Sequence, residues 1–355
     1  MNAYPLPVTV EGVTAAWLSA ALGVPVRRTE VLEVIHSTTT KIRMKLDLDE
    51  AGKAAGIAER VIVKGGFQTH SRGMDHMHLR EVRGYRDIYP EVPLPHPACW
   101  FAGFDEGERQ GILVMEDLSV RGVEFCHATR PQSFAQVRRR LELLAAFHAR
   151  TWGSADIAPG GKWADLVDFF EVMRGFFDTK TAPENWARLT ALPRGLAVSE
   201  RFRGREWMID AWNRVTRFGQ GLPYCVLHGD VHLGNLYIEP DGTPGFLDTL
   251  ASRGPGMLEV AYHIAASVDV ADRAGWEGSL VRHYLDALAR HGAAAPAFGE
   301  AMQQYAVFQV YGHFIWLTTE SHYQAEAVNT ANAMRIGIAM LDHDTVGKVA
   351  ALPSP

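Results

Sequence analysis

The sequence predicts an α+β fold, with a small strand-rich part followed by a larger helical part. Apolar and polar residues alternate along 42–48, which is the pattern of a half-buried strand. Residues 133–136 read Ser-Phe-Ala-Gln, a capping box, and apolar residues recur at helical spacing after it. The chain has 355 residues, which is enough for two lobes with a substantial core.

The composition is that of a soluble globular protein. Hydrophobic residues make up 47% and charged residues 21%, and the formal net charge is −6. An acidic balance argues against a general nucleic-acid or anionic-membrane partner. Cys99, Cys126 and Cys225 lack metal-binding spacing, so we expect reduced thiols and a cytoplasmic location. We expect no signal peptide at residues 1–7 and no transmembrane helix; the oligomeric state is not indicated.

The elements of the first third follow in order. Thr14 is a candidate N-cap and Gly23 a candidate stop for a short helix. Strands are expected at 30–35 and 42–48, and a short apolar run at 61–64 ends in a lysine. The last elements of this third are a pair of strands, expected at 98–104 and 111–115.

The most informative stretch is His228-Gly-Asp-Val-His-Leu-Gly-Asn235, which is followed downstream by Asp248. We expect strands at 235–238 and 245–248, joined by a turn containing Asp-Gly, so that Asp248 returns to the end where Asn235 lies. Phosphoryl transfer needs a carboxylate to accept the proton of the nucleophile, and an Asn and an Asp to hold Mg²⁺. Asp230, Asn235 and Asp248 supply that set.

Two other interpretations apply to the same stretch. His228 and His232 are four residues apart, a spacing that brings two zinc ligands to one face only on a helix. Gly229, Gly234 and the strand-like flanks argue against a helix. An ordinary loop without chemistry would explain His-Gly-Asp alone, but not the full stretch together with Asp248.

The stretch resembles the catalytic loop of the aminoglycoside phosphotransferase and choline kinase group, His-Gly-Asp-x-His-x-x-Asn followed by a metal-binding Asp. Residues 113–118, Leu-Val-Met-Glu-Asp-Leu, resemble the ecdysteroid-kinase-like branch. The resemblance implies a two-lobed protein-kinase-like fold, with a nucleotide-binding lobe at 1–117 and a lobe at 118–355 that carries the catalytic loop, metal site and acceptor site. It also implies roles for the loop: Asp230 as catalytic base, Asn235 and Asp248 as Mg²⁺ ligands, and His228 and His232 as residues that brace the loop.

The same resemblance implies a site for ATP or GTP. Lys64 at a strand end and Glu81 on the next helix stand in the order that the phosphate-positioning ion pair requires. The loop over the phosphates lacks glycine, and a polar hairpin turn explains it equally well. Its residues are Ser37, Thr38, Thr39 and Thr40. The hinge that binds the base through backbone groups is expected at Met115, Glu116, Asp117 and Leu118.

The predicted function is a small-molecule kinase that acts on a hydroxyl group. The alternative is a catalytically weak nucleotide-binding module, which the intact Asp230, Asn235, Asp248 and Lys64 argue against. Glu259 stands where the family usually has Asp, which puts local loop packing in question. Aromatic residues at 163–217 and 300–323 favour a weakly charged acceptor over an aminoglycoside, although most of them are expected in the core.

Overall fold

The computed structural model describes residues 5–353, so part of the stretch in which no signal peptide is expected, residues 1–4, lies outside the described residues. The chain forms two compact units. The first contains the residues up to Glu124, together with Glu239–Asp241 and Gly245–Leu250. The second contains Phe125–Ile238, Gly242–Pro244 and the chain from Ala251 onward. The predicted α+β class, strand-rich first and helical afterwards, is confirmed.

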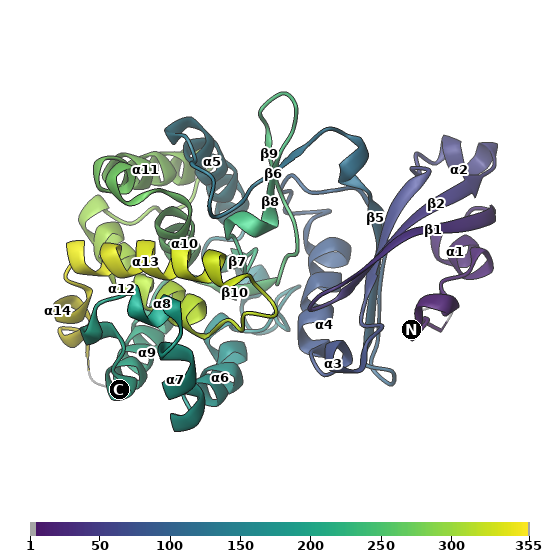
Figure 1. Ribbon diagram of the computed structural model, residues 1–355. Helices are drawn as coiled ribbons and strands as arrows, with labels where there is room; N and C mark the ends of the chain where they lie inside the picture. Colours follow the sequence, from purple (N-terminus) through teal and green to yellow (C-terminus); the bar gives the residue numbers. More distant parts are fainter. Residues whose placement is uncertain (1–4, 354–355) are drawn as a thin grey trace. The chain divides into compact units, whose positions relative to one another are not determined.

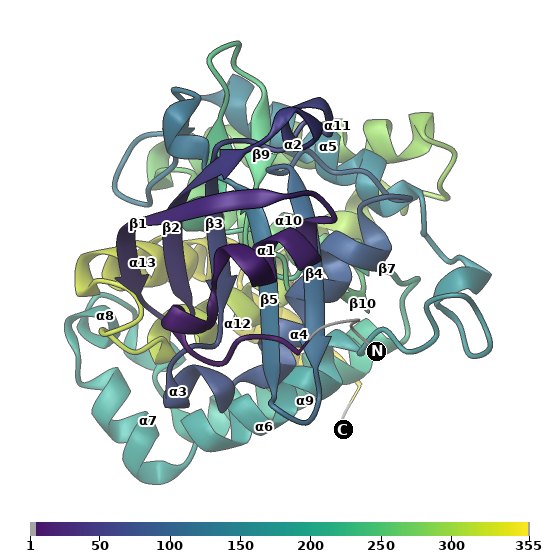
Figure 2. The same ribbon diagram turned by 90° about the vertical axis from the view of Figure 1, so that its right-hand side faces the viewer.

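The first unit is built on a five-stranded antiparallel sheet in the order β1-β2-β3-β5-β4. Its strands are β1 (Val26–His36), β2 (Thr40–Leu48), β3 (Arg60–Gly65), β4 (Cys99–Asp105) and β5 (Gln110–Glu116). Every second residue of β2, starting from Thr40, is buried, as the alternating pattern predicts. Ile42, Met44 and Leu46 belong to a core that also contains Leu18 of α1 (Ala15–Leu22). Figure 2 shows α1 lying across this face of the sheet.

Helix α1 begins and ends as its sequence predicts. The hydroxyl of Thr14 accepts a hydrogen bond from the Trp17 N–H, which is the N-cap arrangement. Gly23 closes the helix in the left-handed conformation that glycine adopts without steric cost.

Strand β1 forms the open edge of the sheet, and it does not pair regularly with β2. Its register shifts between Val26 and Arg28 and again between Val31 and Glu33. Three large apolar side chains on this strand are exposed. They are Val31, Leu32 and Ile35.

Helix α4 (Asp75–Arg83) lies on the opposite side of the sheet from α1 (Figure 1). It continues directly into a π-helical turn, η2 (Gly84–Ile88). A Cβ atom on Gly84 would collide with the methyl group of Thr249, so glycine allows residues 245–250 to approach the helix closely. The other short helices of this unit are η1 (Val10–Gly12), α2 (Glu50–Ala54), α3 (Thr69–Arg72) and η3 (Leu118–Val120).

The second unit is mainly helical. Its helices are α5 (Phe134–Ala149), η4 (Ala155–Ile157), α6 (Phe169–Lys180), α7 (Pro183–Thr190), α8 (Pro193–Leu196), η5 (Glu200–Phe202), α9 (Arg205–Gln220), η6 (Leu233–Asn235), α10 (Gly256–Ser267), α11 (Val270–Arg290), α12 (Phe298–Thr318), α13 (Glu326–Asp342) and α14 (Thr345–Ala350). The expected capping box opens α5. Helix α10 is buried along its whole length and packs against α12. Most aromatic side chains of 163–217 and 300–323 are buried in this core.

Short strands surround the most informative part of the sequence. Strand β7 (Cys225–Leu227) pairs antiparallel with β10 (Ser252–Gly254) in the second unit. The remaining short strands are β6 (Glu124–Phe125), β8 (Leu236–Ile238) and β9 (Pro244–Phe246). The expected strands differ in two details: Asn235 closes the 3₁₀ turn η6 instead of opening β8, and Asp248 lies beyond β9 with φ of 53°. Within residues 5–353, no helix combines the length and apolar character needed to cross a membrane.

Candidate active site

The loop after β7 is fixed from behind by a carboxylate on α10. Glu259 accepts hydrogen bonds from the backbone N–H groups of His228, at 3.2 Å, and Gly229. The Nε2 atom of His148 on α5 donates to the same carboxylate at 2.9 Å, and the other ring nitrogen accepts from the Tyr284 hydroxyl. Glu259 therefore holds the loop backbone. Its difference from the family's Asp is compatible with an ordered loop.

Asp230 is positioned within this loop by Asn235. The Asn235 Nδ2 atom donates to the backbone oxygen and to the carboxylate Oδ2 of Asp230, at 3.0 Å in both cases. The 3₁₀ turn η6 brings the two residues together, because it reverses the chain directly after the loop. Since both bonds use the amide nitrogen, the orientation of the amide leaves Oδ1 of Asn235 available to a cation.

His228 and His232 contact the backbone of the loop. The Nδ1 atom of His228 accepts from the Asp230 N–H at 3.3 Å, and Nδ1 of His232 accepts from the Gly234 N–H at 3.0 Å. The other ring nitrogen of His232, Nε2, lies 3.5 Å from Oδ2 of Asp230. Each ring thus uses one nitrogen to shape the loop.

Two aromatic residues lie beside this loop: Trp316, one of the aromatic residues of 300–323, and Tyr262, which the sequence did not single out. Trp316 on α12 packs edge-on against the His232 ring, with centroids 5.3 Å apart, and stacks with Tyr262 of α10 at 6.4 Å. Burial and the nearby Asp230 carboxylate raise the pKa of the Tyr262 hydroxyl well above its ordinary value. No local motif predicts that these two residues lie near the loop, because α10 and α12 contact the loop only through tertiary packing.

In the first unit, Lys64 joins two carboxylates. Its Nζ atom donates to Oε1 of Glu81 at 2.6 Å and to Oδ1 of Asp248 at 2.9 Å. Lys64 and Glu81 come from β3 and α4, and Asp248 from the segment after β9. A second lysine, Lys41 of β2, lies 3.5 Å from Oδ2 of Asp248. Sequence reasoning did not assign Lys41, although its alternation with Ile42 places it on the face opposite the α1 core.

The charges of this cluster stabilise one another. Burial alone would lower the pKa of Lys64, but Asp248 and Glu81 outweigh it and raise that pKa above its ordinary value. Burial would raise the pKa of Asp248, but Lys64 and Lys41 lower it below the usual range. For Glu81 burial dominates, and its pKa is raised. Asp248 is therefore ionised at neutral pH.

The Asp248 turn is anchored on α4. Asp248 has a left-handed backbone, which Asp tolerates better than most residues. Arg80 of α4 donates through Nη2 to the Leu250 carbonyl at 2.6 Å, and the Thr249 methyl packs against Gly84. These contacts hold in place the segment that follows the end of β9 at Phe246.

Hard oxygen ligands fit a magnesium ion. Within residues 5–353, no three His, Cys, Asp or Glu side chains converge as a metal-binding group. Mg²⁺ does not need such a group, because it is usually held by one or two protein ligands together with water and substrate phosphates. Oδ1 of Asn235 in the second unit and the ionised carboxylate of Asp248 in the first are each hard oxygen groups of the kind that binds Mg²⁺.

The predicted hinge residues follow the end of β5. Met115 and Leu118 are buried. Glu116 forms an ion pair with Arg121 at 2.7 Å, and Asp117 caps η3 through the Ser119 N–H. The side chains of Glu116 and Asp117 are thus bound to protein groups, which leaves recognition of a base here to the backbone.

The predicted phosphate loop closes on itself through its side chains. The hydroxyl of Ser37 donates to the Thr39 carbonyl at 2.9 Å, and Nδ1 of His36 lies 3.3 Å from Oγ1 of Thr40. Thr39 and Thr40 are buried, and Thr38 is partly exposed. The loop is therefore shaped by internal hydrogen bonds in place of glycine.

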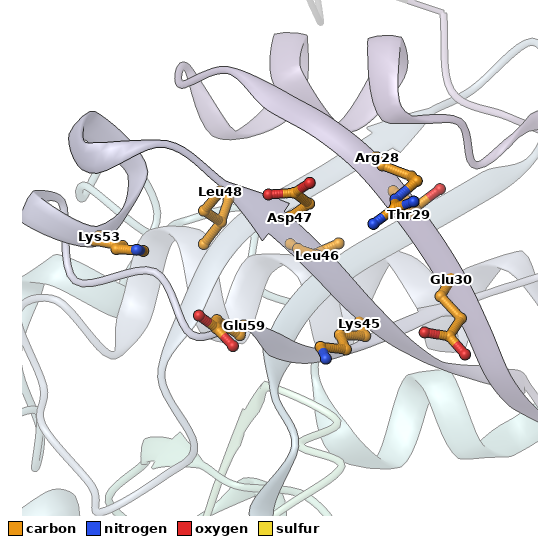
Figure 3. A pocket seen from close by; sticks show the side chains of 9 residues that line it. All are labelled: Arg28, Thr29, Glu30, Lys45, Leu46, Asp47, Leu48, Lys53 and Glu59. Atoms are coloured by element: carbon orange, nitrogen blue, oxygen red, sulfur yellow. The ribbon is translucent and has the colours of Figure 1, made fainter.

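A hollow of about 630 Å³ lies elsewhere in the first unit, along β1, β2 and α2 (Figure 3). Six charged side chains line it together with Thr29, Leu46 and Leu48. They are Arg28, Glu30, Lys45, Asp47, Lys53 and Glu59. Glu30 faces Lys45, and Arg28 faces Asp47, across the β1–β2 register. Such cross-strand pairs of opposite charge stabilise a solvated sheet surface. The hollow contains none of the predicted site residues.

Comparisons with a protein family and with solved structures place the chain among known proteins. The family model described as "Phosphotransferase enzyme family" matches residues 76–296. The match includes Glu81, Asp230, Asn235 and Asp248, and it begins after Lys64. Comparison with curated proteins gives no match.

Solved structures share the fold at low sequence identity. Choline kinase LicA from Streptococcus pneumoniae is 14% identical, with a TM-score of 0.50 over 89% of this chain and 94% of that chain. The amicoumacin kinase hAmiN, in complex with AMP-PNP, Ca²⁺ and Ami, is 11% identical, with a TM-score of 0.51 over 90% and 89%. The GDP and kanamycin complex of APH(2")-IIia is 11% identical, with a TM-score of 0.50 over 94% and 98%.

Proposed function

Since this chain belongs to the phosphotransferase enzyme family, we propose that it transfers the γ-phosphate of ATP or GTP to a hydroxyl group of a small molecule. The observation that carries the proposal is Lys64, bound between Glu81 and Asp248. A lysine held by a helix carboxylate beside a metal-binding Asp is the arrangement that kinase-like enzymes use to bind nucleotide phosphates. The nucleotides in the complexes of hAmiN and APH(2")-IIia support the choice of co-substrate.

In this proposal the residues up to 117 bind the nucleotide. Lys64 neutralises phosphate charge, and Glu81 keeps the ammonium in place. The backbone of Met115–Leu118 binds the base, and the loop at 37–40 covers the phosphates. This assignment is supported by the burial of Met115 and Leu118 and by the bound side chains of Glu116 and Asp117.

Residues 118–355 carry the chemistry. Asp230 accepts the proton of the acceptor hydroxyl, in an orientation that Asn235 sets through its two hydrogen bonds. Asn235 and Asp248 hold Mg²⁺, and the bound ion supplies positive charge at the phosphate oxygens. His228 and His232 keep the loop in shape. Catalysis is then mainly positioning and electrostatic stabilisation.

The acceptor is a hydroxyl compound of low charge. The composition of residues 163–217 and 300–323 motivates this choice, since both segments are rich in aromatic residues and small-molecule sites are mostly apolar with a few polar groups. A nucleotide-consumption screen against neutral alcohols, macrolides and aminoglycosides separates the classes. Turnover confined to aminoglycosides would contradict the preference for low charge.

The test of the catalytic role is Asp230→Asn. We expect turnover of the best acceptor from the screen to fall by roughly 10²- to 10⁴-fold, because the amide cannot accept the proton in the transition state. Nucleotide affinity, measured by calorimetry, should change little. Asp241→Asn removes an exposed carboxylate from the turn before β9 and serves as the matched control. Near-normal turnover of Asp230→Asn would contradict the assignment.

A further inference from the structure

Lys41 and Lys64 lie directly opposite each other on neighbouring strands. The β2–β3 register pairs them, and Ile42 and Val63, the next residues, point into the core under α1. Because side chains alternate along a strand, both lysines lie on the other face of the sheet. This is the face from which Lys64 reaches Glu81.

Each carboxylate oxygen of Asp248 faces one of these lysines. Lys64 binds Oδ1 at 2.9 Å, and the Lys41 ammonium lies 3.5 Å from Oδ2. The two ammonium groups differ in accessibility: the Lys64 side chain is 6% exposed, whereas Lys41 is 35% and Asp248 33% exposed. Lys41 is thus the lysine that an incoming anion meets in solvent.

The neighbouring loop leaves phosphate charge to be neutralised by another group. Residues 36–40 contain no glycine, and the Ser37 and Thr40 side chains are engaged within the loop. Neutral hydroxyls that already have partners add little to the binding of a triphosphate, while an ammonium forms charge-assisted hydrogen bonds. Lys41 stands directly after this loop, at the start of β2.

We propose that Lys41 is a second phosphate-binding lysine, which covers one oxygen of Asp248 in the free protein and transfers to the nucleotide phosphates when they bind. The inference rests on the proposed function, because it requires a nucleotide. It has a further consequence for the metal. In the free protein a cation must compete with both lysines for Asp248, so the metal binds well only together with the nucleotide.

The experiment compares Lys41→Ala and Lys41→Arg with Lys45→Ala. Lys45 belongs to the same face of β2 but lies in the hollow beside Glu30, so it is the matched control (Figure 3). Calorimetry measures the affinity for Mg-ATP, Mg-GTP and the free nucleosides. Electron paramagnetic resonance measures Mn²⁺ binding to the nucleotide-free protein. Thermal unfolding checks that each variant is folded, which is expected because an exposed ion pair contributes little stability.

For Lys41→Ala we expect the affinity for the preferred triphosphate to fall about 10-fold or more, while affinity for its nucleoside stays unchanged. Without nucleotide, Mn²⁺ should bind to Lys41→Ala more tightly than to the wild type. Lys41→Arg should retain most triphosphate affinity, and Lys45→Ala should behave as the wild type.

Unchanged triphosphate affinity of Lys41→Ala would overturn the phosphate-binding role and leave the proposed function intact. A loss of triphosphate affinity without tighter Mn²⁺ binding would overturn the covering of Asp248. A wild-type protein that binds no triphosphate would overturn the proposed function itself, and the inference with it.

Discussion

Asp248 must meet two requirements, one on its backbone conformation and one on its side chain. Its left-handed backbone redirects the chain after β9, and its carboxylate lies between two ammonium groups. Glycine is the usual residue for a left-handed backbone, but it has no carboxylate to bind the lysines. Asp serves both purposes, since its short side chain tolerates this conformation better than most.

Gly84→Ala tests whether the Asp248 turn depends on close packing against α4. The new methyl group would collide with Thr249, so we expect a loss of roughly 1–3 kcal/mol in the free energy of unfolding, measured with denaturant. Stabilisation by Mg-nucleotide should fall as well, because Asp248 is displaced.

Gly175→Ala is the control for this variant. Gly175 lies in α6 with open space around its Cα, and alanine there should raise stability by up to about 1 kcal/mol. If the Gly84→Ala protein were as stable as the wild type, residues 245–250 would be able to move away from the new methyl group without a loss of stability.

Single residues were predictable where the motif is contiguous. Asp230 and Asn235 stand in one short stretch, and η6 brings them together by local geometry alone. Lys41 and Tyr262 required knowledge of strand register and helix packing, which one sequence does not carry. The alternation along β2 does place Lys41 opposite the core, so its face was predictable and its partner was not.

Among the elements, those with regular periodicity were predicted well. Helix α1 has its expected cap and stop, and the capping box opens α5. The π-helical turn η2 and the early end of β9 have no signal in residue periodicity. Both lie where residues 245–250 approach α4 and η2 closely, which is a tertiary contact.

A pH-dependent contact joins three elements of the second unit. Glu320, just after α12, binds Arg188 of α7 and Lys180 at the end of α6, and hydrogen bonding from Arg188, followed by Lys180, lowers its pKa to about 2. A depressed carboxyl pKa adds stability above the unfolded value, near 4.5, and this stability is lost as the pH falls through about 2.

Glu320→Gln should therefore destabilise the protein by about 1–2 kcal/mol at pH 7 and have little effect at pH 2. Denaturant unfolding at a series of pH values measures the difference. Glu184→Gln, an exposed position on α7, is the control. A Glu320→Gln effect that is constant with pH would show that packing, and not charge, joins these helices.

For the whole molecule, the resemblance to the aminoglycoside phosphotransferase and choline kinase group is confirmed, as are the fold class and the enzyme class, a phosphotransferase with an alcohol group as acceptor. The family match does not favour the alternative of a catalytically weak nucleotide-binding module. The placement in the ecdysteroid-kinase-like branch stays a prediction. The low charge of the acceptor also stays a prediction, because it was inferred from helical segments whose aromatic residues mostly fill the core.

Removal of the metal tests the molecule as a whole. Millimolar Mg-ATP or Mg-GTP should raise the melting temperature, because a ligand that binds only the folded protein stabilises it. Excess EDTA should abolish this increase, because it removes the cation that joins Asp248 to the phosphates. An equal increase in melting temperature in EDTA would contradict the metal assignment. If neither nucleotide raised the melting temperature, the kinase function would be contradicted.

The two register shifts of β1 also affect how the protein behaves at high concentration. A regular open strand bearing Val31, Leu32 and Ile35 would offer a template on which another chain could add a strand. Each bulge breaks the even spacing of N–H and C=O groups and increases the local twist. The edge is thereby a poorer template for intermolecular sheet growth than a regular strand would be.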